Sequence, residues 1–186
     1  VYGTVTKTPV MPGADLVAYS GFTTANYLQQ PYSSNLNFGT GDFSIGFWLK
    51  YGVSATQYVM DRSADGNQRI AIYLTDPSGG SLNFYTNGEG SQPSEVTGIF
   101  GSDGWVQCWC IRRSGTHEIW VNGVNKASSA LTSRDVTQLD SAPLVIAQRF
   151  NGSAGSIGTG VNLALFRISA TAPSAEQIKK MYNDEK

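Results

Sequence analysis

The feature that most constrains how this chain folds is a short segment in which large apolar residues alternate with small or polar ones. The alternating apolar positions are Phe43, Ile45, Phe47 and Leu49. A period of two places all four side chains on one face of a β-strand. We therefore predict a strand over residues 42–51 that forms the floor of a β-sandwich core.

The other face of this strand carries Ser44, Gly46 and Trp48. Gly46 leaves room for another backbone or for a bulge to come close. Trp48 either packs beneath a second layer of structure or lies on an exposed face. If this face meets solvent, replacing Ser44 with alanine should change the free energy of unfolding by no more than about 0.5 kcal/mol.

The rest of the chain repeats the pattern of short strands separated by turns. Further strands are expected over residues 25–29, 58–61, 69–74, 81–86, 105–112, 117–121, 124–127, 144–147 and 161–168. Asn122-Gly123 is a strong hairpin signal because both residues tolerate a positive φ. With 186 residues, 40% of them hydrophobic, and 21 glycines, the chain suits one all-β domain. We place a linker, or the end of a preceding unit, at residues 1–15.

The end of the chain has the pattern of a helix. Ser174 and Gln177 match a capping box, in which the two side chains satisfy each other's backbone N–H groups. Ile178, Met181 and Tyr182 form an apolar stripe at helical spacing. We expect one short helix that acts as a lid over one end of the core.

Charge and hydropathy argue against two classes of partner. Thirteen basic and fourteen acidic residues give a net charge of −1, and no basic run offers the electrostatic surface that nucleic acids require. No apolar run approaches the roughly 20 residues that cross a bilayer, so membrane insertion is not expected. Val1-Tyr2-Gly3-Thr4 is neither a Met start nor a signal peptide, which suits a fragment of a longer protein or a processed product.

Cys108 and Cys110 share one face of a predicted strand, with Cα atoms roughly 6.5–7 Å apart. This separation is at the outer limit of disulfide geometry, so we expect two buried free thiols that pack as small hydrophobic groups. His117 is the single histidine, and its place beside the Ser114-Gly115 turn predicts a surface residue. Two cysteines and one histidine do not make a metal-binding motif.

Carboxylates are the residues that would indicate glycosidase chemistry. Two of them must flank the scissile bond, about 5–5.5 Å apart for retention or 6.5–9.5 Å for inversion. No predicted strand carries two inward carboxylates. We interpret the candidates as solvated surface residues: Asp61, Asp65, Glu89, Glu95 and Glu118. The sequence favours a protein that is not an enzyme, with a glycan-degrading enzyme as the less favoured alternative.

Four pieces of sequence occur in order along the chain, at residues 42–50, 104–112, 118–123 and 174–182. Together they resemble the laminin-G-like, concanavalin-A-like jelly-roll superfamily over residues 25–184. The resemblance implies an all-β, two-sheet antiparallel jelly-roll β-sandwich with a short C-terminal α-helix, which makes residues 16–186 a jelly-roll domain. It also implies a curved concave face that often binds carbohydrate or protein.

Residues 26–41 also resemble modules embedded in bacteriophage tail fibres and virion appendages. Together with the missing carboxylate pair, the two resemblances predict a non-catalytic, lectin-like module that recognises a cell-surface glycan or polysaccharide, in a virion or extracellular setting. The alternative from another class is a structural or protein-interaction module of a virion or extracellular fibre. Homo-oligomerisation through a parent fibre is left open.

Two polar loops, residues 61–69 and 148–153, carry the side chains best suited to a polar ligand. Loops gather at the ends of the sheets in sandwich proteins, so these two are candidates to converge. The predicted ligand-binding residues are Tyr51, Tyr58, Asp61, Asn67, Arg69, Arg149 and Asn151. In this hypothesis a tyrosine ring stacks on a sugar while the polar groups bind its hydroxyls. The alternative is two unrelated surface loops.

Calcium is the one cofactor that we consider. Asp61, Asp65 and Asn67 offer oxygens of the kind that calcium binds, and the resemblance implies a calcium ion at the rim in many members of the superfamily. The spacing is not that of an EF-hand, and a turn explains Asp65-Gly66-Asn67 equally well.

Overall fold

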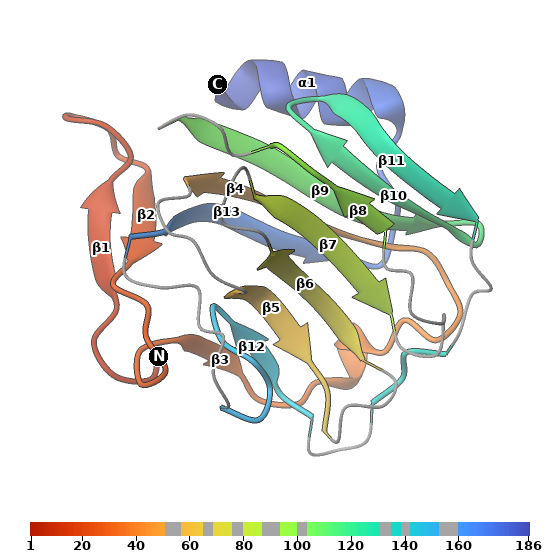
Figure 1. Ribbon diagram of the computed structural model, residues 1–186, viewed down its shortest axis with the longest axis horizontal. Coiled ribbons are helices and arrows are strands. Elements are labelled where there is room, and N and C mark those ends of the chain that lie inside the picture. Colours follow the sequence, from red (N-terminus) through yellow and green to blue (C-terminus); the bar gives the residue numbers. More distant parts are fainter. Residues whose placement is uncertain are drawn as a thin grey trace.

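Two antiparallel sheets pack face to face in the computed structural model, which describes residues 1–50, 57–64, 69–75, 80–86, 94–99, 104–130, 135–138, 142–152 and 160–186 (Figure 1). The first sheet has seven strands in the order β1 (Thr6–Pro9), β2 (Val17–Ser20), β13 (Asn162–Ser169), β4 (Phe43–Lys50), β9 (Trp105–Arg113), β10 (Thr116–Val121) and β11 (Val124–Ala130). The second has six in the order β3 (Leu28–Gln30), β12 (Leu144–Ile146), β5 (Gln57–Arg62), β6 (Ile70–Thr75), β7 (Ser81–Thr86) and β8 (Ser94–Val96). A 3-10 helix, η1 (Ser34–Leu36), and the C-terminal helix α1 (Ala175–Glu185) complete the described elements. The predicted jelly-roll β-sandwich with a short C-terminal helix is confirmed.

The inner face of β4 forms the floor of the core, as its alternation predicts. Its apolar side chains are fully buried: Phe43, Ile45, Phe47 and Leu49. The ring of Phe43 meets Phe84 of β7 edge to face, with centroids 5.9 Å apart, so the contact joins the two sheets. Burying a large apolar side chain contributes roughly 1.5–3 kcal/mol, and four of them make this strand a main source of stability.

Two thiols lie in the same core. Cys108 and Cys110 of β9 pair with Phe47 and Ile45 of β4, and both are buried and free, as predicted. Burial raises the pKa of both thiols, and Cys108 adds to the effect on Cys110. Protonated, buried thiols are poor nucleophiles, so this pair contributes packing and not chemistry.

Tight turns connect β9, β10 and β11. Asn122 and Gly123 have φ values of 49° and 76°, which confirms the predicted hairpin between β10 and β11. Ser114 and Gly115, with φ values of 47° and 79°, turn β9 back into β10. Turns with two positive φ values match the right-handed twist of the strands that they join.

The first residues of the chain take part in the sandwich. Residues 1–15, where the sequence suggests a linker, include β1, which pairs with β2 at one edge of the seven-stranded sheet. Tyr2 forms an isolated bridge with Tyr27, and their rings stack with centroids 4.7 Å apart. Pairing with β1 satisfies the backbone groups that β2 would otherwise leave open.

The outer face of β4 is covered and not solvated, which corrects the expectation for Ser44. This side chain is buried, and its hydroxyl donates to the Thr171 carbonyl over 2.7 Å. Helix α1 packs across this face, so its predicted position over one end of the core is wrong (Figure 1). Tyr182 stacks on Trp48 with centroids 6.0 Å apart, and Ile178 is fully buried. The sheet presents large apolar side chains on both faces, and only a second layer buries the outer ones.

Helix α1 is fixed at both ends. The predicted capping box is confirmed, because Ser174 accepts from the Gln177 backbone N–H and the Gln177 side chain accepts from that of Ser174. At the other end Glu185 accepts hydrogen bonds from Trp48 over 2.6 Å and from Arg167 over 2.8 Å.

No helix in the described part of the chain has the length and apolar character needed to cross a bilayer.

Two polar residues of β10 are buried, so their predicted surface positions are wrong. His117 faces the core, where its Nε2 lies 3.3 Å from the Thr86 hydroxyl. Glu118 points the other way, forms an ion pair with Arg113 at 2.9 Å and accepts from the Trp120 indole over 2.7 Å. The reason is that β10 lies inside the sheet, between β9 and β11, where both of its faces are covered.

Candidate site at the outer face of the six-stranded sheet

A bulge in β5 decides which side chains reach the outer face of the six-stranded sheet. The register pairs Tyr58 with Tyr73 of β6 and resumes at Met60, so Val59 is an extra residue. Val59 and Met60 both contribute to the core. Strict alternation would place Tyr58 and Asp61 on opposite faces, but the extra residue places both on the outer face.

Asp61 is the buried anchor of this region. Arg69 donates to both of its carboxylate oxygens, from Nε to Oδ1 over 2.7 Å and from Nη2 to Oδ2. The backbone N–H of Phe150 donates to Oδ2 over 3.1 Å. The side chain of Asp61 is 0% exposed, so its expected position in a solvated loop is wrong. Through these bonds Asp61 joins the start of β6 to the segment that follows β12.

The electrostatics of the Asp61–Arg69 pair follow from its burial. Desolvation raises the pKa of the Asp61 carboxyl, and the hydrogen bonds and charge of Arg69 offset part of this effect. Desolvation also acts to lower the pKa of Arg69, but the hydrogen bonds and charge of Asp61 outweigh it and the pKa rises. Removing either partner leaves a buried charge uncompensated, which is strongly destabilising.

Aromatic rings and guanidinium groups gather above this anchor. We call the group the Tyr58 cluster, and it consists of Tyr58, Arg69, Tyr73, Arg149 and Phe150. The guanidinium carbons of Arg69 and Arg149 lie 5.0 and 5.7 Å from the Tyr58 ring centroid, and 5.5 and 6.0 Å from that of Phe150. The Tyr58 and Tyr73 rings are 5.4 Å apart. All five residues are half-buried, so the cluster presents partly exposed aromatic rings and guanidinium groups to a ligand.

The structure brings together four of the predicted ligand-binding residues: Tyr58, Asp61, Arg69 and Arg149. Asn151 is exposed in the adjoining turn, where the Gly152 N–H donates to the Arg149 carbonyl over 3.0 Å. Three other predicted residues lie outside the described part of the chain: Tyr51, Asp65 and Asn67. The two loops thus meet through Asp61 and Phe150, while the place of Asn67 remains a prediction.

Two members of the cluster were not predicted. Phe150 lies inside the predicted loop 148–153, and its backbone N–H ties that loop to Asp61. Tyr73 lies between buried Ile72 and Leu74 in a strand of alternating residues. That alternation marks Tyr73 as facing outward, but pairing with Tyr58 requires the strand register, which sequence spacing does not reveal.

Asp61 does not fit the predicted role of a calcium ligand. Both of its oxygens accept hydrogen bonds from Arg69, and Oδ2 accepts another from Phe150. A calcium ion would have to displace a bidentate guanidinium from a buried carboxylate. Within the ranges that the structure describes, no group of three or more His, Cys, Asp or Glu residues is placed to hold a metal ion.

The family of the chain follows from a sequence comparison. A family model described as the concanavalin A-like lectin/glucanases superfamily matches residues 22–179. The match spans most of the 186 residues, so the chain belongs to this superfamily, and the resemblance stated from its motifs is confirmed. No curated protein matches the chain in sequence.

Solved structures share the fold at low sequence identity. Domain 4 of AbnA, a GH43 extracellular arabinanase from Geobacillus stearothermophilus, in complex with arabinotriose, is 17% identical, with a TM-score of 0.66 over 97% of this chain and 82% of that one. The binding domain of botulinum neurotoxin DC, in complex with SialylT, is 14% identical, with a TM-score of 0.70 over 98% of this chain and 45% of that one. The same toxin domain in complex with rat synaptotagmin II is also 14% identical, with a TM-score of 0.68 over 98% of this chain and 45% of that one. The chain therefore spans less than half of the toxin domains, and these likenesses establish the fold alone.

Proposed function

We propose that this chain is a non-catalytic carbohydrate-binding module and that the Tyr58 cluster is its binding surface. The observation that carries the proposal is the placement of ring faces beside guanidinium donors on the outer face of the six-stranded sheet. Membership of a lectin and glucanase superfamily supports it. The arabinotriose complex of the AbnA domain shows a sugar bound to a protein of this fold.

Each member of the cluster has a distinct part in the proposal. The half-buried rings of Tyr58 and Tyr73 present apolar faces on which the C–H surface of a sugar stacks. Arg149 donates hydrogen bonds to hydroxyl oxygens. Asp61 makes no contact with the ligand, because its oxygens are already bound, and instead fixes the position of Arg69.

The proposed setting is the exterior of a cell or virion. The likeness of residues 26–41 to modules of phage tail fibres supports recognition of a host cell-surface glycan or polysaccharide by a fibre or appendage. Sugar binding through a small surface of this kind is weak for one copy, and a fibre that carries several copies gains avidity.

A second candidate function is a protein-interaction module. Its support is the complex of a similar toxin domain with rat synaptotagmin II. Tyrosine and arginine are enriched at protein interfaces as well as at sugar sites, so the Tyr58 cluster suits either kind of partner. A glycan array distinguishes the two functions, because saturable sugar binding is expected only of the carbohydrate-binding module.

The proposal is tested on an array of bacterial polysaccharides and cell-surface glycans, followed by calorimetric titration with any ligand found. We expect saturable binding that Tyr58→Ala weakens about three- to tenfold, as loss of one aromatic contact does. Arg149→Ala should weaken binding without shifting the melting temperature. Lys126→Ala, an exposed change on the distant strand β11, is the matched control and should bind as wild type does.

Other outcomes would change the assignment. Silence across the array with a folded protein would favour the protein-interaction function. A melting temperature lowered by Arg149→Ala would make Arg149 a structural tie. Binding that survives both substitutions would place the carbohydrate site elsewhere on the molecule.

A further inference from the structure

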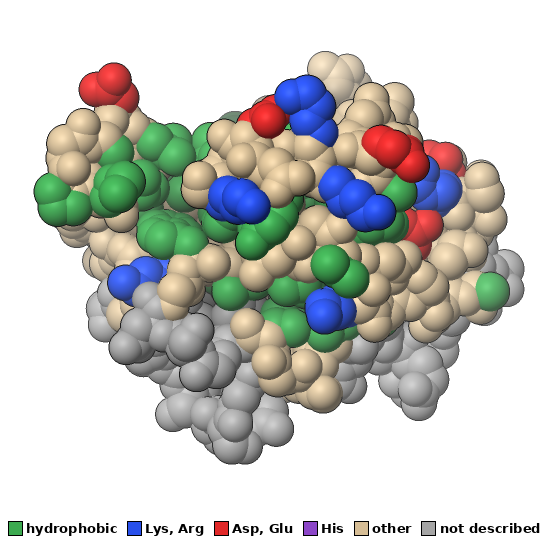
Figure 2. All heavy atoms as spheres, turned by 90° about the horizontal axis from the view of Figure 1, so that it is seen from above, with side chains coloured by type: hydrophobic (Ala, Val, Ile, Leu, Met, Phe, Trp, Pro, Cys, Tyr) green, Lys and Arg blue, Asp and Glu red, His purple; other side chains and the backbone are tan. Residues whose placement is uncertain are grey.

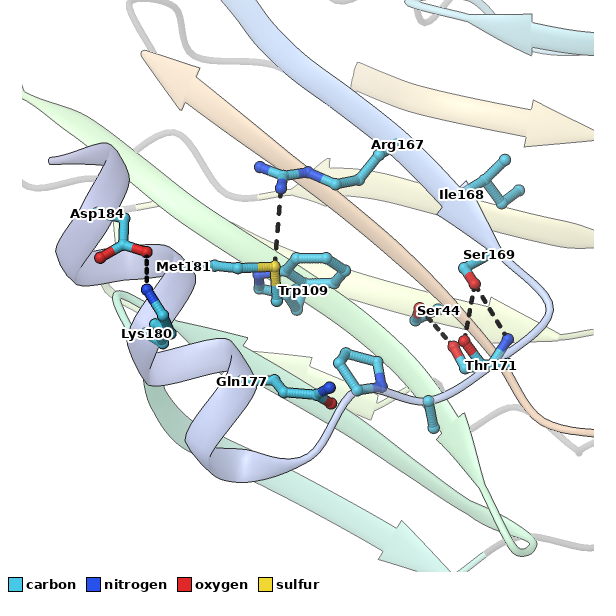
Figure 3. Close-up of a pocket in the computed structure, with 12 residues that line it drawn as sticks. Ser44, Trp109, Arg167, Ile168, Ser169, Thr171, Gln177, Lys180, Met181 and Asp184 are labelled. Atoms are coloured by element: carbon cyan, nitrogen blue, oxygen red, sulfur yellow. Dashed lines mark hydrogen bonds and ion pairs between the residues drawn. The ribbon is translucent and has the colours of Figure 1, made fainter.

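A groove lies on the opposite side of the sandwich, between α1 and the outer face of the seven-stranded sheet (Figure 3). Its volume is about 690 Å³, which is within the range of small-molecule sites. Trp109, Ala172 and Met181 contribute apolar surface. The exposed residues Ser169 and Thr171 contribute hydroxyls. None of the lining residues belongs to the Tyr58 cluster.

The ring of Trp109 forms the base of the groove, and it fits there because Gly46 beneath it has no side chain. Trp109 and Arg167 are the register partners of Gly46 on its two sides. A Cβ atom at Gly46 would lie 2.7 Å from three carbons of the Trp109 ring, so the ring lies directly against the glycine. The Arg167 guanidinium is 5.2 Å from the centroid of the same ring. The tryptophan therefore lies across the sheet and not upright from it.

The indole N–H of Trp109 lacks an acceptor. Two other tryptophans on this face have one, since Trp48 donates to Glu185 over 2.6 Å and Trp120 donates to Glu118 over 2.7 Å. Trp109 is only 4% exposed, and its Nε1 has no hydrogen-bond partner among the described residues. A buried donor without an acceptor is unfavourable, and native structures contain few of them. An oxygen from a ligand in the groove would satisfy it.

The charges around the groove cancel. Arg167 pairs with Glu185 at 2.8 Å, and Lys180 pairs with Asp184 one turn along α1. Figure 2, which views the molecule from above, shows acidic and basic side chains interspersed on the visible face, with no large area of one sign. Two matched pairs leave no net charge to select an anion or a cation. The hydroxyls of Ser169 and Thr171, 2.9 Å apart, add neutral donors and acceptors.

We propose that this groove is a second binding site, for an uncharged saccharide of about one to three rings given its volume. One sugar oxygen accepts the hydrogen bond from the Trp109 indole, and other hydroxyls bind Ser169 and Thr171. Met181 is flexible and moves aside to let the sugar reach the indole. The site does not depend on the Tyr58 cluster, because the two lie on the outer faces of different sheets.

Nuclear magnetic resonance of the intact protein tests the proposal through the indole N–H signals of the four tryptophans. The probes are glucose, galactose, mannose and arabinose, with a linked disaccharide and trisaccharide of each. We expect at least one probe to shift the Trp109 signal saturably while those of Trp48 and Trp120 move little. Trp109→Phe keeps an aromatic ring but removes the donor, so the signal that disappears is that of Trp109. In a calorimetric titration this variant should bind about three- to tenfold more weakly.

Further variants separate this site from the Tyr58 cluster. Ser169→Tyr changes an exposed residue and fills the groove, so it should abolish the shift even if Trp109→Phe does not fold. Tyr58→Ala should leave the shift intact, whatever it does to binding on the glycan array. No saturable shift with any probe would overturn the proposal. Glucuronate and glucosamine serve as charged comparison probes, and a shift with either of them but with none of the neutral sugars would overturn the uncharged ligand class.

Discussion

At the scale of single residues, His117 makes the stability of this protein depend on pH. Burial, with a smaller contribution from the Arg112 charge, lowers the pKa of His117 from 6.5 to about 4. Between pH 6.5 and about 4, His117 binds a proton in the unfolded chain but not in the folded chain. The free energy of unfolding is therefore highest above pH 6.5 and falls as the pH drops towards 4. The expected loss is on the order of 2–3 kcal/mol.

Urea unfolding at a series of pH values measures this effect. His117→Gln removes the only histidine of the chain, so the difference between wild type and variant isolates its titration from that of the carboxylates. We expect the wild type to lose more stability than the variant between pH 6.5 and 4. Parallel curves for the two proteins would show that His117 is protonated as readily in the fold as outside it.

The residues of the candidate site were partly predictable. Asp61, Arg69 and Arg149 stand out because polar side chains next to the ends of predicted strands gather at the ends of a sheet. Their arrangement was not predictable, because it depends on the extra residue Val59, which lets Tyr58 and Asp61 share a face. The bulge was not recognisable from the sequence, because Val59 and Met60 are both apolar and either one alone would fit a regular strand. For the same reason the sequence places Asp61 where a predicted strand meets a polar loop, although it lies within β5 and is buried.

At the scale of elements, the packing of the Trp109 ring of β9 against β4 requires a glycine at position 46. Gly46→Ala should destabilise the fold by about 1–3 kcal/mol, as overpacking does, because the new methyl group collides with the Trp109 ring. In a Trp109→Ala background the same change should have a much smaller effect, so the pair is strongly non-additive. Urea titration of the four proteins gives the coupling. Equal effects of Gly46→Ala in both backgrounds would mean that strain elsewhere, and not the ring, opposes the methyl group.

The sequence determines where α1 begins and which of its residues are apolar, but it does not determine which surface the helix packs against. Ser174, Gln177 and Ile178 predict the start and the apolar stripe of the helix from local spacing alone, and the structure has both. The stripe does not say which surface it covers. Trp109 and Trp120 were the available signal, because large apolar side chains facing away from the core need a second layer. Without the strand register, however, their direction was ambiguous.

At the scale of the whole molecule, the two thiols report on global opening. Cys108 and Cys110 are buried on β9, between β4 and β10, so we expect that fraying of an edge strand does not expose them. Alkylation in native buffer should leave both unlabelled, because burial and the raised pKa suppress the thiolate. After unfolding, mass spectrometry should find two labels. Rapid labelling of the native protein would show that the sheet opens locally, and an unlabelled mass two units light would reveal a disulfide.

The place of β13 in the seven-stranded sheet has a consequence during synthesis of the chain. This strand enters between β2 and β4, yet β4 ends at residue 50 and β13 begins at residue 162 (Figure 1). At ribosomal speeds the delay is on the order of ten seconds, during which one edge of β4 has no partner from its own chain. An open apolar edge invites pairing with a neighbouring molecule. The misassembly that this topology favours is therefore exchange of β13 between two nascent copies.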